Sequence, residues 1–429
     1  MPELDRTHVE EAIDLVKSPG ERDAELRAAA RLRRLDTLVQ YFISEFPADT
    51  EGLQVSTDEL DNRIRDLLEE ARGQPESVAT FENGFEQLPS EITSIPLEQY
   101  KLGVPLNISP GFPRDELKFQ DTRFERVPRD EWMDRFAEPA LDDNGFSEHF
   151  EEVPNDFDEG YTYWEFEYEA RDPEHVLETT ERHLGVILGQ LIYCLFPWSH
   201  TNQFGGGTVW NRPWSELRLP FVYILRDQEG YHDAYFGDDI SPRHSIRMFG
   251  DRRERIETRY QTIPQFDDPN DVDQKLINAF RNFQSGATEP NRRQAFLDYW
   301  RAVETLCVFG DERMKIVAHR AKAVIGDDNG DELLERRLEE IKDKRNSLVH
   351  EKVGVTITQR DNEFLRSILY NLVEFMISKR GWDPEEIKLW LDNASKPDGQ
   401  LTHKLDQLEN EMDDNRRDAE VIRNILGSR

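Results

Sequence analysis

One short stretch of the chain combines a guanidinium, a carboxamide and an imidazole: Arg345, Asn346 and His350. Such groups bind anions, fix the orientation of a neighbouring ring and exchange protons near neutral pH. Asn346 and His350 are four residues apart, so on a continuous helix the amide can reach the imidazole and hold it in one orientation. These residue types and their spacing indicate acid–base chemistry at an anionic group.

The element that must position these residues is a helix predicted over residues 331–352. Its apolar residues Leu334, Leu338, Ile341 and Leu348 recur at steps of four, three and seven, as in an amphipathic helix. Arg345 lies on the same stripe. A guanidinium cannot lose its charge, so among apolar neighbours it requires an anionic or hydrogen-bonding partner, or else it extends to the edge of the stripe.

The spacing of Arg345 and His350 limits how the two can act together. They are five residues apart, which is roughly 140° around a helix. Both side chains would therefore reach one ligand only if the helix breaks between them or if a second copy of the helix contributes one of them.

Arg345-Asn346-Ser347-Leu348-Val349-His350 resembles the R-polar-x-x-x-H motif of the HEPN superfamily, many of whose members are RNases. The flanking pattern resembles its ApeA-like branch more narrowly, with a helix containing residues 296–306 (FLDYWRAVETL), then a basic helix, the motif and an apolar helix. The resemblance covers roughly residues 271–380. Glu351 departs from it, because relatives often have Gly after the His.

The resemblance implies a dimeric RNA endonuclease that needs no metal and no cofactor. The RNA 2'-hydroxyl would attack the adjacent phosphodiester and leave a 2',3'-cyclic phosphate and a 5'-hydroxyl. His350 would be the general acid or base, Arg345 would stabilise the charge that develops on the phosphoryl oxygens, and Asn346 would hold the imidazole. RNA is the expected substrate because only RNA supplies the internal nucleophile.

The residues before the motif have a basic side that suggests an RNA contact. Arg313, Lys315, Arg320 and Lys322 lie on the predicted preceding helix, where they form either a solvated face or a track for phosphates. Residues 271–393 contain 20 basic and 23 acidic residues, whereas the whole chain has a net charge of −34. This relief from acidity is what a surface that meets a polyanion requires.

A non-catalytic sensor or scaffold is the alternative from a different functional class. In that case the helical bundle would only dimerise, and the long acidic front half would bind a protein partner. Relatives in the branch are associated with defence against phage, so in either version the N-terminal and central regions would sense a phage or host protein trigger.

The composition indicates a soluble protein of a salt-rich cytoplasm. Only 13 of the 54 basic residues are Lys, and Asp and Glu total 88, an acid excess whose self-repulsion salt would screen. Cys194 and Cys307 are the only cysteines, so neither a disulfide framework nor a cysteine metal cluster is expected. The first residues lack the pattern of a signal peptide, and no apolar run is long enough to cross a membrane.

The predicted fold is multidomain, with an α-helical N-terminal segment, an α+β central domain and an all-α C-terminal bundle. Trp164, Phe166 and Tyr168 alternate with glutamates as in a half-buried strand, and Asp172-Pro173 begins a helix with an apolar face. A β-hairpin is predicted around residues 227–230. Gly205-Gly206-Gly207 lacks the following Lys-Ser or Lys-Thr of a phosphate-binding loop. The predicted parts are residues 1–72, 73–263, 264–393 and 394–429.

Two further patterns concern the C-terminal half. The polar, Pro-containing tract 264–271 is the best candidate for a linker. After Pro397, apolar residues recur at alternating steps of four and three through Leu426, as in the heptads of a coiled coil. The same spacing suits a short helix that packs on its own bundle, and the sequence leaves both readings open.

Overall fold

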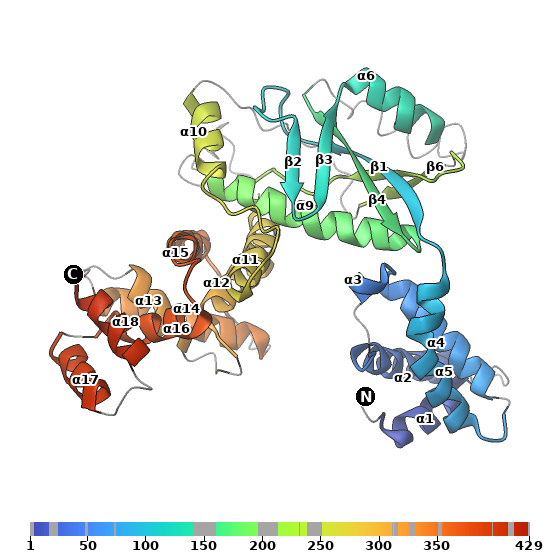
Figure 1. Cartoon of the computed structure of the whole chain (residues 1–429), viewed down its shortest axis with the longest axis horizontal. Coiled ribbons are helices and arrows are strands. Elements are labelled where there is room, and N and C mark those ends of the chain that lie inside the picture. Colours follow the sequence, from blue (N-terminus) through green and yellow to red (C-terminus); the bar gives the residue numbers. More distant parts are fainter. Residues whose placement is uncertain are drawn as a thin grey trace.

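The computed structural model describes residues 4–16, 25–47, 50–72, 74–140, 160–195, 213–230, 232–237, 251–310, 312, 316–325, 331–350, 354–396, 398–410 and 416–427. Across these residues the chain forms N-terminal helices, a six-stranded antiparallel sheet with helices, and a C-terminal helical region (Figure 1). The predicted order of helical, α+β and all-helical parts is confirmed. No helix in these ranges is long and apolar enough to span a membrane.

The N-terminal helices pack around a core of their own. They are α1 (Arg6–Val16), α2 (Glu25–Ser44), α3 (Thr50–Leu53), α4 (Thr57–Arg72) and α5 (Ser77–Ser94). The start of α4 is set by a side-chain cap, because the Ser56 hydroxyl accepts a hydrogen bond from the Glu59 backbone N–H at 3.0 Å. The helical part extends to Ser94, beyond the boundary expected at residue 72. The reason is that α5 buries Phe81, Phe85, Leu88 and Ile92 against the other helices.

The central sheet has the strand order β2-β3-β4-β1-β5-β6, with every neighbouring pair antiparallel. Its strands are β1 (Glu98–Leu106), β2 (Glu116–Phe119), β3 (Thr122–Val127), β4 (Thr162–Ala170), β5 (Val222–Arg226) and β6 (His232–Phe236). The predicted strand with alternating aromatic and acidic residues is β4. The predicted hairpin is β5 and β6.

Helices cover both faces of this sheet. On one face lies α9 (Pro173–Leu195), nearly all of it buried (Figure 1). On the other face, α6 (Arg129–Trp132) and the π-helical turn η1 (Met133–Ala137) insert Trp132 and Phe136. Gly103 of β1 makes room for them, since a Cβ there would lie 2.6 Å from the Phe136 ring. The sheet is thus the middle layer of three.

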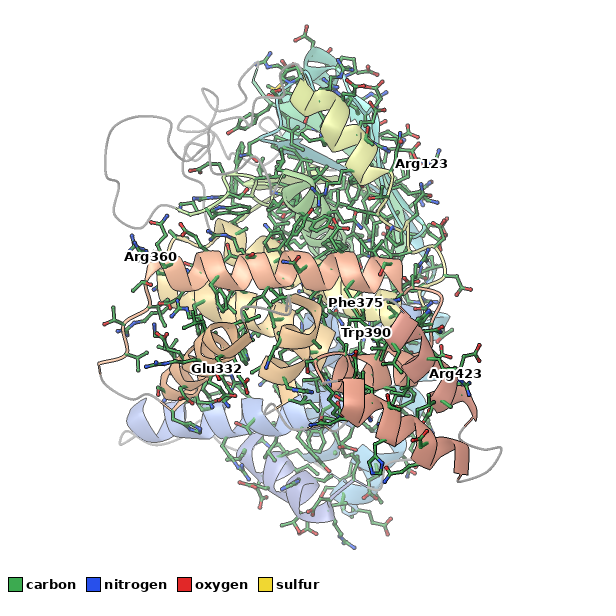
Figure 2. All side chains as sticks on the ribbon, turned by 90° about the vertical axis from the view of Figure 1, so that its left-hand side faces the viewer. Arg123, Glu332, Arg360, Phe375, Trp390 and Arg423 are labelled. Atoms are coloured by element: carbon green, nitrogen blue, oxygen red, sulfur yellow. The ribbon has the colours of Figure 1, made fainter. Side chains whose placement is uncertain are left out.

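One more described helix, α10 (Asp251–Tyr260), packs on α9 beside the central sheet. The C-terminal region has eight described helices, which are α11 (Asp271–Thr288), α12 (Arg292–Cys307), α13 (Ile316–Ile325), α14 (Asp331–Val349), α15 (Gln359–Ser378), α16 (Pro384–Asn393), α17 (Asp398–Asn410) and α18 (Arg416–Gly427). The apolar α15 lies across the bundle, as its composition predicts, and Phe375 on it packs on Trp390 of α16 with ring centroids 4.5 Å apart (Figure 2).

The central sheet layer and the bundle share one hydrophobic core. α9 and α11 approach so closely at Gly189 that a Cβ there would lie 2.1 Å from the Phe280 carbonyl oxygen. The tract 264–271, predicted as a linker, also enters this core. Phe266 in it is 1% exposed and lies between Phe119 and Phe280, with ring centroids 6.2 and 6.5 Å away. The tract therefore fastens the two parts to each other.

The tail after Pro397 packs on its own chain. α17 ends at Asn410, α18 begins at Arg416, and the two helices contact each other. Leu401, Val421, Ile422 and Ile425 are buried together against Trp382 and Trp390. Of the two readings of the four-and-three spacing, this structure therefore adopts packing on the chain's own bundle.

We predict opposite effects of one substitution at two glycines of α9. Gly189→Ala should lower the free energy of unfolding by about 1–3 kcal/mol, since the added methyl group forces α9 away from the α11 backbone. Gly185→Ala is the matched control, because its Cβ would meet only the Arg281 side chain at 3.6 Å. It should be neutral or stabilise by up to about 1 kcal/mol. Denaturant titration of both variants tests this, and equal losses would contradict the close contact.

Candidate functional site

Helix α14 positions the motif as its apolar stripe predicts. Leu338 and Ile341 are fully buried, while Leu334 and Leu348 pack at the edge of the core. The helix contacts α12 and α13. It ends at Val349, so Arg345 and Asn346 are in its last turns and His350 is the first residue beyond it.

Arg345 has an anionic partner, which is one of the outcomes predicted from its place on the apolar stripe. Its Nη2 lies 3.8 Å from Oε2 of Glu304, which belongs to α12. The two side chains are 19% and 25% exposed. α12 carries the segment 296–306 that formed part of the family resemblance, so this segment and the motif meet at a charged pair.

The Asn346 side chain contacts Arg345 and not the imidazole. Its Oδ1 accepts a hydrogen bond from Arg345 Nη1 at 3.4 Å, and its carbonyl oxygen accepts one from the His350 backbone N–H at 3.1 Å. We expected the amide to orient the His350 ring, but among the described residues the Asn346 side chain pairs with the Arg345 guanidinium instead.

His350 is exposed to solvent at the end of α14. Among the described residues its imidazole has no hydrogen bond and no ion pair. Glu351, the departure from the family pattern, lies outside the described residues, as do residues 352 and 353. Arg345 is thus held by its own chain, whereas the imidazole is open to a ligand or to another chain.

A buried carboxylate fastens this end of α14 to α15. Asp361 accepts hydrogen bonds from Arg337 at 2.7 Å and from Lys344 at 2.8 Å, both on α14. It also forms a capping box with Thr358 at the start of α15. Burial alone would raise the pKa of Asp361, but hydrogen bonds from Lys344 and Thr358 outweigh it and hold the pKa below its ordinary value. The motif is therefore anchored one residue before Arg345.

Arg320 requires a correction, because it is not on a surface where it could meet phosphates. It is fully buried and makes ion pairs with Glu312 at 2.5 Å and with Asp392 at 2.7 Å. A further hydrogen bond runs to the Cys307 carbonyl oxygen at 2.6 Å. The bond from Arg320 lowers the pKa of Glu312 to about 2. This guanidinium joins α12, α13 and α16.

The other three predicted RNA contacts are placed only in part. Lys322 on α13 is 14% exposed and makes an ion pair at 2.8 Å with Glu335 of α14. Arg313 and Lys315 lie outside the described residues. The described residues therefore do not form the basic side that was predicted for this helix.

A polar groove that the sequence reasoning missed lies between α11 and α12 and includes Glu304, the partner of Arg345. Its volume is about 610 Å³, and its lining includes the carboxamides Gln274, Asn278 and Asn282. These follow one another at steps of four on one face of α11, a signal that the sequence does contain. Within the described chain none of the three carboxamides has a side-chain hydrogen bond.

We predict that the Asp361 anchor depends on pH in a defined direction. Its contribution to stability is complete above the unfolded-state pKa of about 3.9 and disappears as the pH falls through the lower folded-state pKa. Asp361→Asn should therefore lower the free energy of unfolding by about 1–3 kcal/mol at pH 7, with a smaller difference near pH 3. Denaturant titrations at both pH values measure this.

The exposed Asp343, also on α14 and without a side-chain partner among the described residues, supplies the control variant Asp343→Asn. It should match the wild type at either pH. A loss for Asp361→Asn that is the same at pH 7 and pH 3 would show that the carboxylate charge is not what fastens α14.

The chain matches no family model, no curated protein and no solved structure. Within the described ranges, no group of three or more His, Cys, Asp or Glu side chains could hold a metal ion. The function is therefore inferred from α14 and its surroundings.

Proposed function

We propose that this protein is an HEPN-type RNA endonuclease that cleaves without a metal ion and acts as a dimer. The observation that supports it most is the end of α14. There Arg345 is held by Glu304 and Asn346, and His350 stands exposed one turn later without a partner among the described residues. A guanidinium held in place and an accessible imidazole are the two groups that acid–base chemistry on a phosphodiester requires.

The proposed reaction is an internal transfer within the RNA strand. The 2'-oxygen forms a bond to phosphorus as the bond from phosphorus to the 5'-oxygen breaks. One proton leaves the 2'-hydroxyl and another reaches the departing 5'-oxygen, and His350 carries out one or both transfers. Arg345 stabilises the negative charge on the non-bridging oxygens, with its planar fork matched to two of them.

A second copy of the chain would complete this site. The Arg345 side chain is directed to α12 of its own chain, whereas His350 lies beyond the helix end, roughly 140° further round. A dimer with two motifs face to face would place the imidazole of one protomer near the guanidinium of the other. It would also supply two imidazoles, one to accept a proton and one to donate.

The groove between α11 and α12 suits an RNA strand that must bind in high salt. In molar salt the Debye length is about 3 Å, so distant basic residues attract phosphates only weakly. Neutral carboxamides such as Asn278 and Asn282 make short-range hydrogen bonds that salt does not screen. The groove shares Glu304 with Arg345, so a strand in it would lie beside the motif.

We expect His350→Ala to reduce RNA cleavage by about 10²- to 10⁴-fold, since it removes a general acid or base. Arg345→Ala should cost about 10²- to 10³-fold, because it removes a charge-stabilising donor. Arg336→Ala, at an exposed position of the same helix, should leave the rate unchanged. Gel assays on total RNA measure these rates, and circular dichroism shows whether each variant folds.

The product ends and a chelator distinguish the mechanism. Cleavage should persist in chelator and should leave a 5'-hydroxyl and a 2',3'-cyclic phosphate. A 5'-phosphate would contradict attack by the 2'-hydroxyl. If the wild type cuts no RNA while His350→Ala unfolds or loses its dimer, the motif is structural. The protein would then be a non-catalytic sensor or scaffold that responds to a phage or host trigger.

We also predict that the protein is a dimer or a larger multiple in molar salt, as light scattering at micromolar concentration would show. Removing residues 398–429 should leave the number of subunits unchanged, since α17 and α18 pack on α16 of their own chain. A monomeric wild type would contradict the shared site. A shortened chain that becomes monomeric would assign the subunit contact to the tail.

A further inference from the structure

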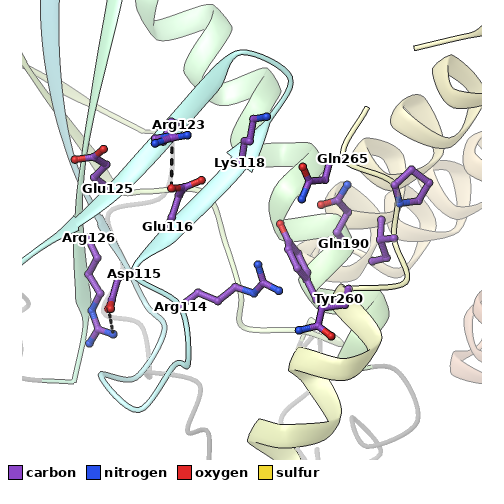
Figure 3. Close-up of a pocket in the computed structure, with 13 residues that line it drawn as sticks. Arg114, Asp115, Glu116, Lys118, Arg123, Glu125, Arg126, Gln190, Tyr260 and Gln265 are labelled. Atoms are coloured by element: carbon purple, nitrogen blue, oxygen red, sulfur yellow. Dashed lines mark ion pairs between the residues drawn. The ribbon is translucent and has the colours of Figure 1, made fainter. Parts of the chain in front are cut away.

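A cavity with a polar lining lies beside the central sheet, and no residue of α14 lines it. It has a volume of about 810 Å³ and is bounded by β2, β3, α9, α10 and residues 261–265 (Figure 3). Small organic ligands occupy pockets of roughly 300–1,000 Å³. Nothing in the proposed RNase reaction uses this cavity.

Arg114 is a cation of this pocket that the described chain leaves unneutralised. Its guanidinium lies over the Tyr260 ring, 4.6 Å from the centroid, and its buried Nε has no hydrogen-bond partner. Among the described residues no carboxylate is within ion-pair distance of it. A guanidinium always keeps its charge, so this position is complementary to an anion.

The other cations at the pocket are already neutralised. Arg123 is 3.5 Å from Glu116 and Arg126 is 3.6 Å from Asp115, both at the exposed hairpin of β2 and β3. Lys118 is 2.8 Å from Asp267. Figure 3 shows the Arg123 and Arg126 pairs on the hairpin, whereas Arg114 extends towards Tyr260. An entering anion would therefore meet Arg114 with the least competition.

Gln190 is a buried carboxamide that also lacks a partner. It is 3% exposed, and the surrounding part of α9 is apolar. Within the described chain its amide makes no hydrogen bond, so its N–H donors and its carbonyl oxygen are available to a molecule in the pocket. Gln190 and Gln265 line the same pocket, and Figure 3 shows both carboxamides near Tyr260. Together they present two donors and two acceptors to the space that Arg114 faces.

We propose that this pocket binds a nucleotide, with the phosphate on Arg114 and the edge of the base on the carboxamides of Gln190 and Gln265. A carboxamide pairs with the adjacent donor and acceptor atoms of a nucleobase through two parallel hydrogen bonds. An inorganic anion would use Arg114 and leave the buried Gln190 amide unpaired. A nucleotide satisfies both groups.

The occupant would contact both the β2–β3 hairpin and the tract that leads into α11. Residues 263–265 line the pocket, and Phe266, the next residue, is inserted between the sheet and α11. A bound nucleotide would thus restrain the segment that joins the central sheet to the bundle. This inference is independent of the RNase proposal.

The test is titration calorimetry of the full-length protein with AMP, GMP, CMP and UMP. The corresponding nucleosides and inorganic phosphate serve as separate arms. At least one nucleotide should bind with a dissociation constant below about 1 mM, and more tightly than its nucleoside or phosphate alone. The His350→Ala variant should bind equally well, so failure of the RNase proposal would leave this result unchanged.

Variants then locate the site. Arg114→Gln and Gln190→Leu should each weaken nucleotide binding about tenfold or more. Arg123→Gln, at the same pocket but on the exposed rim, should change it by less than about twofold. If Gln190→Leu does not fold, Gln265→Ala at an exposed position replaces it, with weaker nucleotide binding expected.

Three results would overturn the proposal. The first is that no nucleotide binds. The second is that inorganic phosphate binds as tightly as every nucleotide, which would mean that the carboxamides read no base. The third is that Arg123→Gln weakens binding as much as Arg114→Gln, which would place the ligand on the rim.

Discussion

The contact between α9 and α11 is the constraint on which the rest of the structure depends. α9 carries the central sheet on one side and the C-terminal bundle on the other, and it is buried along nearly its whole length. At Gly189, which has no side chain, the backbone of α9 lies directly against the backbone of α11. Packing this close gives many dispersion contacts and removes apolar surface from water, and both stabilise the contact. The orientation of α11, and of α12 that packs on it, is therefore fixed from the sheet.

Inside the bundle, position is fixed by a few fully paired charges. Arg320 satisfies its guanidinium with two carboxylates and a carbonyl, and Asp361 receives two cations from α14. Breaking such a buried pair on one side costs far more than an exposed pair contributes. Buried pairs are also screened little by salt. The Asp361 contacts thus hold α14, and with it Arg345, in position.

Much of the local structure could be predicted because its causes are local. The alternation in β4, the Asp172-Pro173 start of α9 and the Thr358 cap of α15 each depend on residues within one element. The apolar stripe of α14 likewise predicted that Arg345 either has an anionic or hydrogen-bonding partner or extends to the edge of the stripe. Spacing along a helix says nothing about the identity of that partner, and Glu304 is 41 positions away in the sequence.

The predictions that differ from the structure failed because they concern contacts that only the fold determines. Arg320 carries the same charge as its neighbours in the sequence, and only the fold brings Glu312 and Asp392 around it. Asn346 has two neighbours within reach, and in the structure its carboxamide pairs with Arg345. The HEPN resemblance remains a proposal about function.

The burial of Phe266 matters for any attempt to cut the protein into fragments at the tract before α11. Its polar, Pro-containing composition marks residues 264–271 as a place to cut the chain into a sensing half and an effector half. Yet Phe266 is buried between Phe119 and Phe280, and α9 remains on the first half while α11 begins the second. Each half produced alone would carry an apolar face made for the other. Isolated fragments would aggregate instead of reporting the properties of an independent domain.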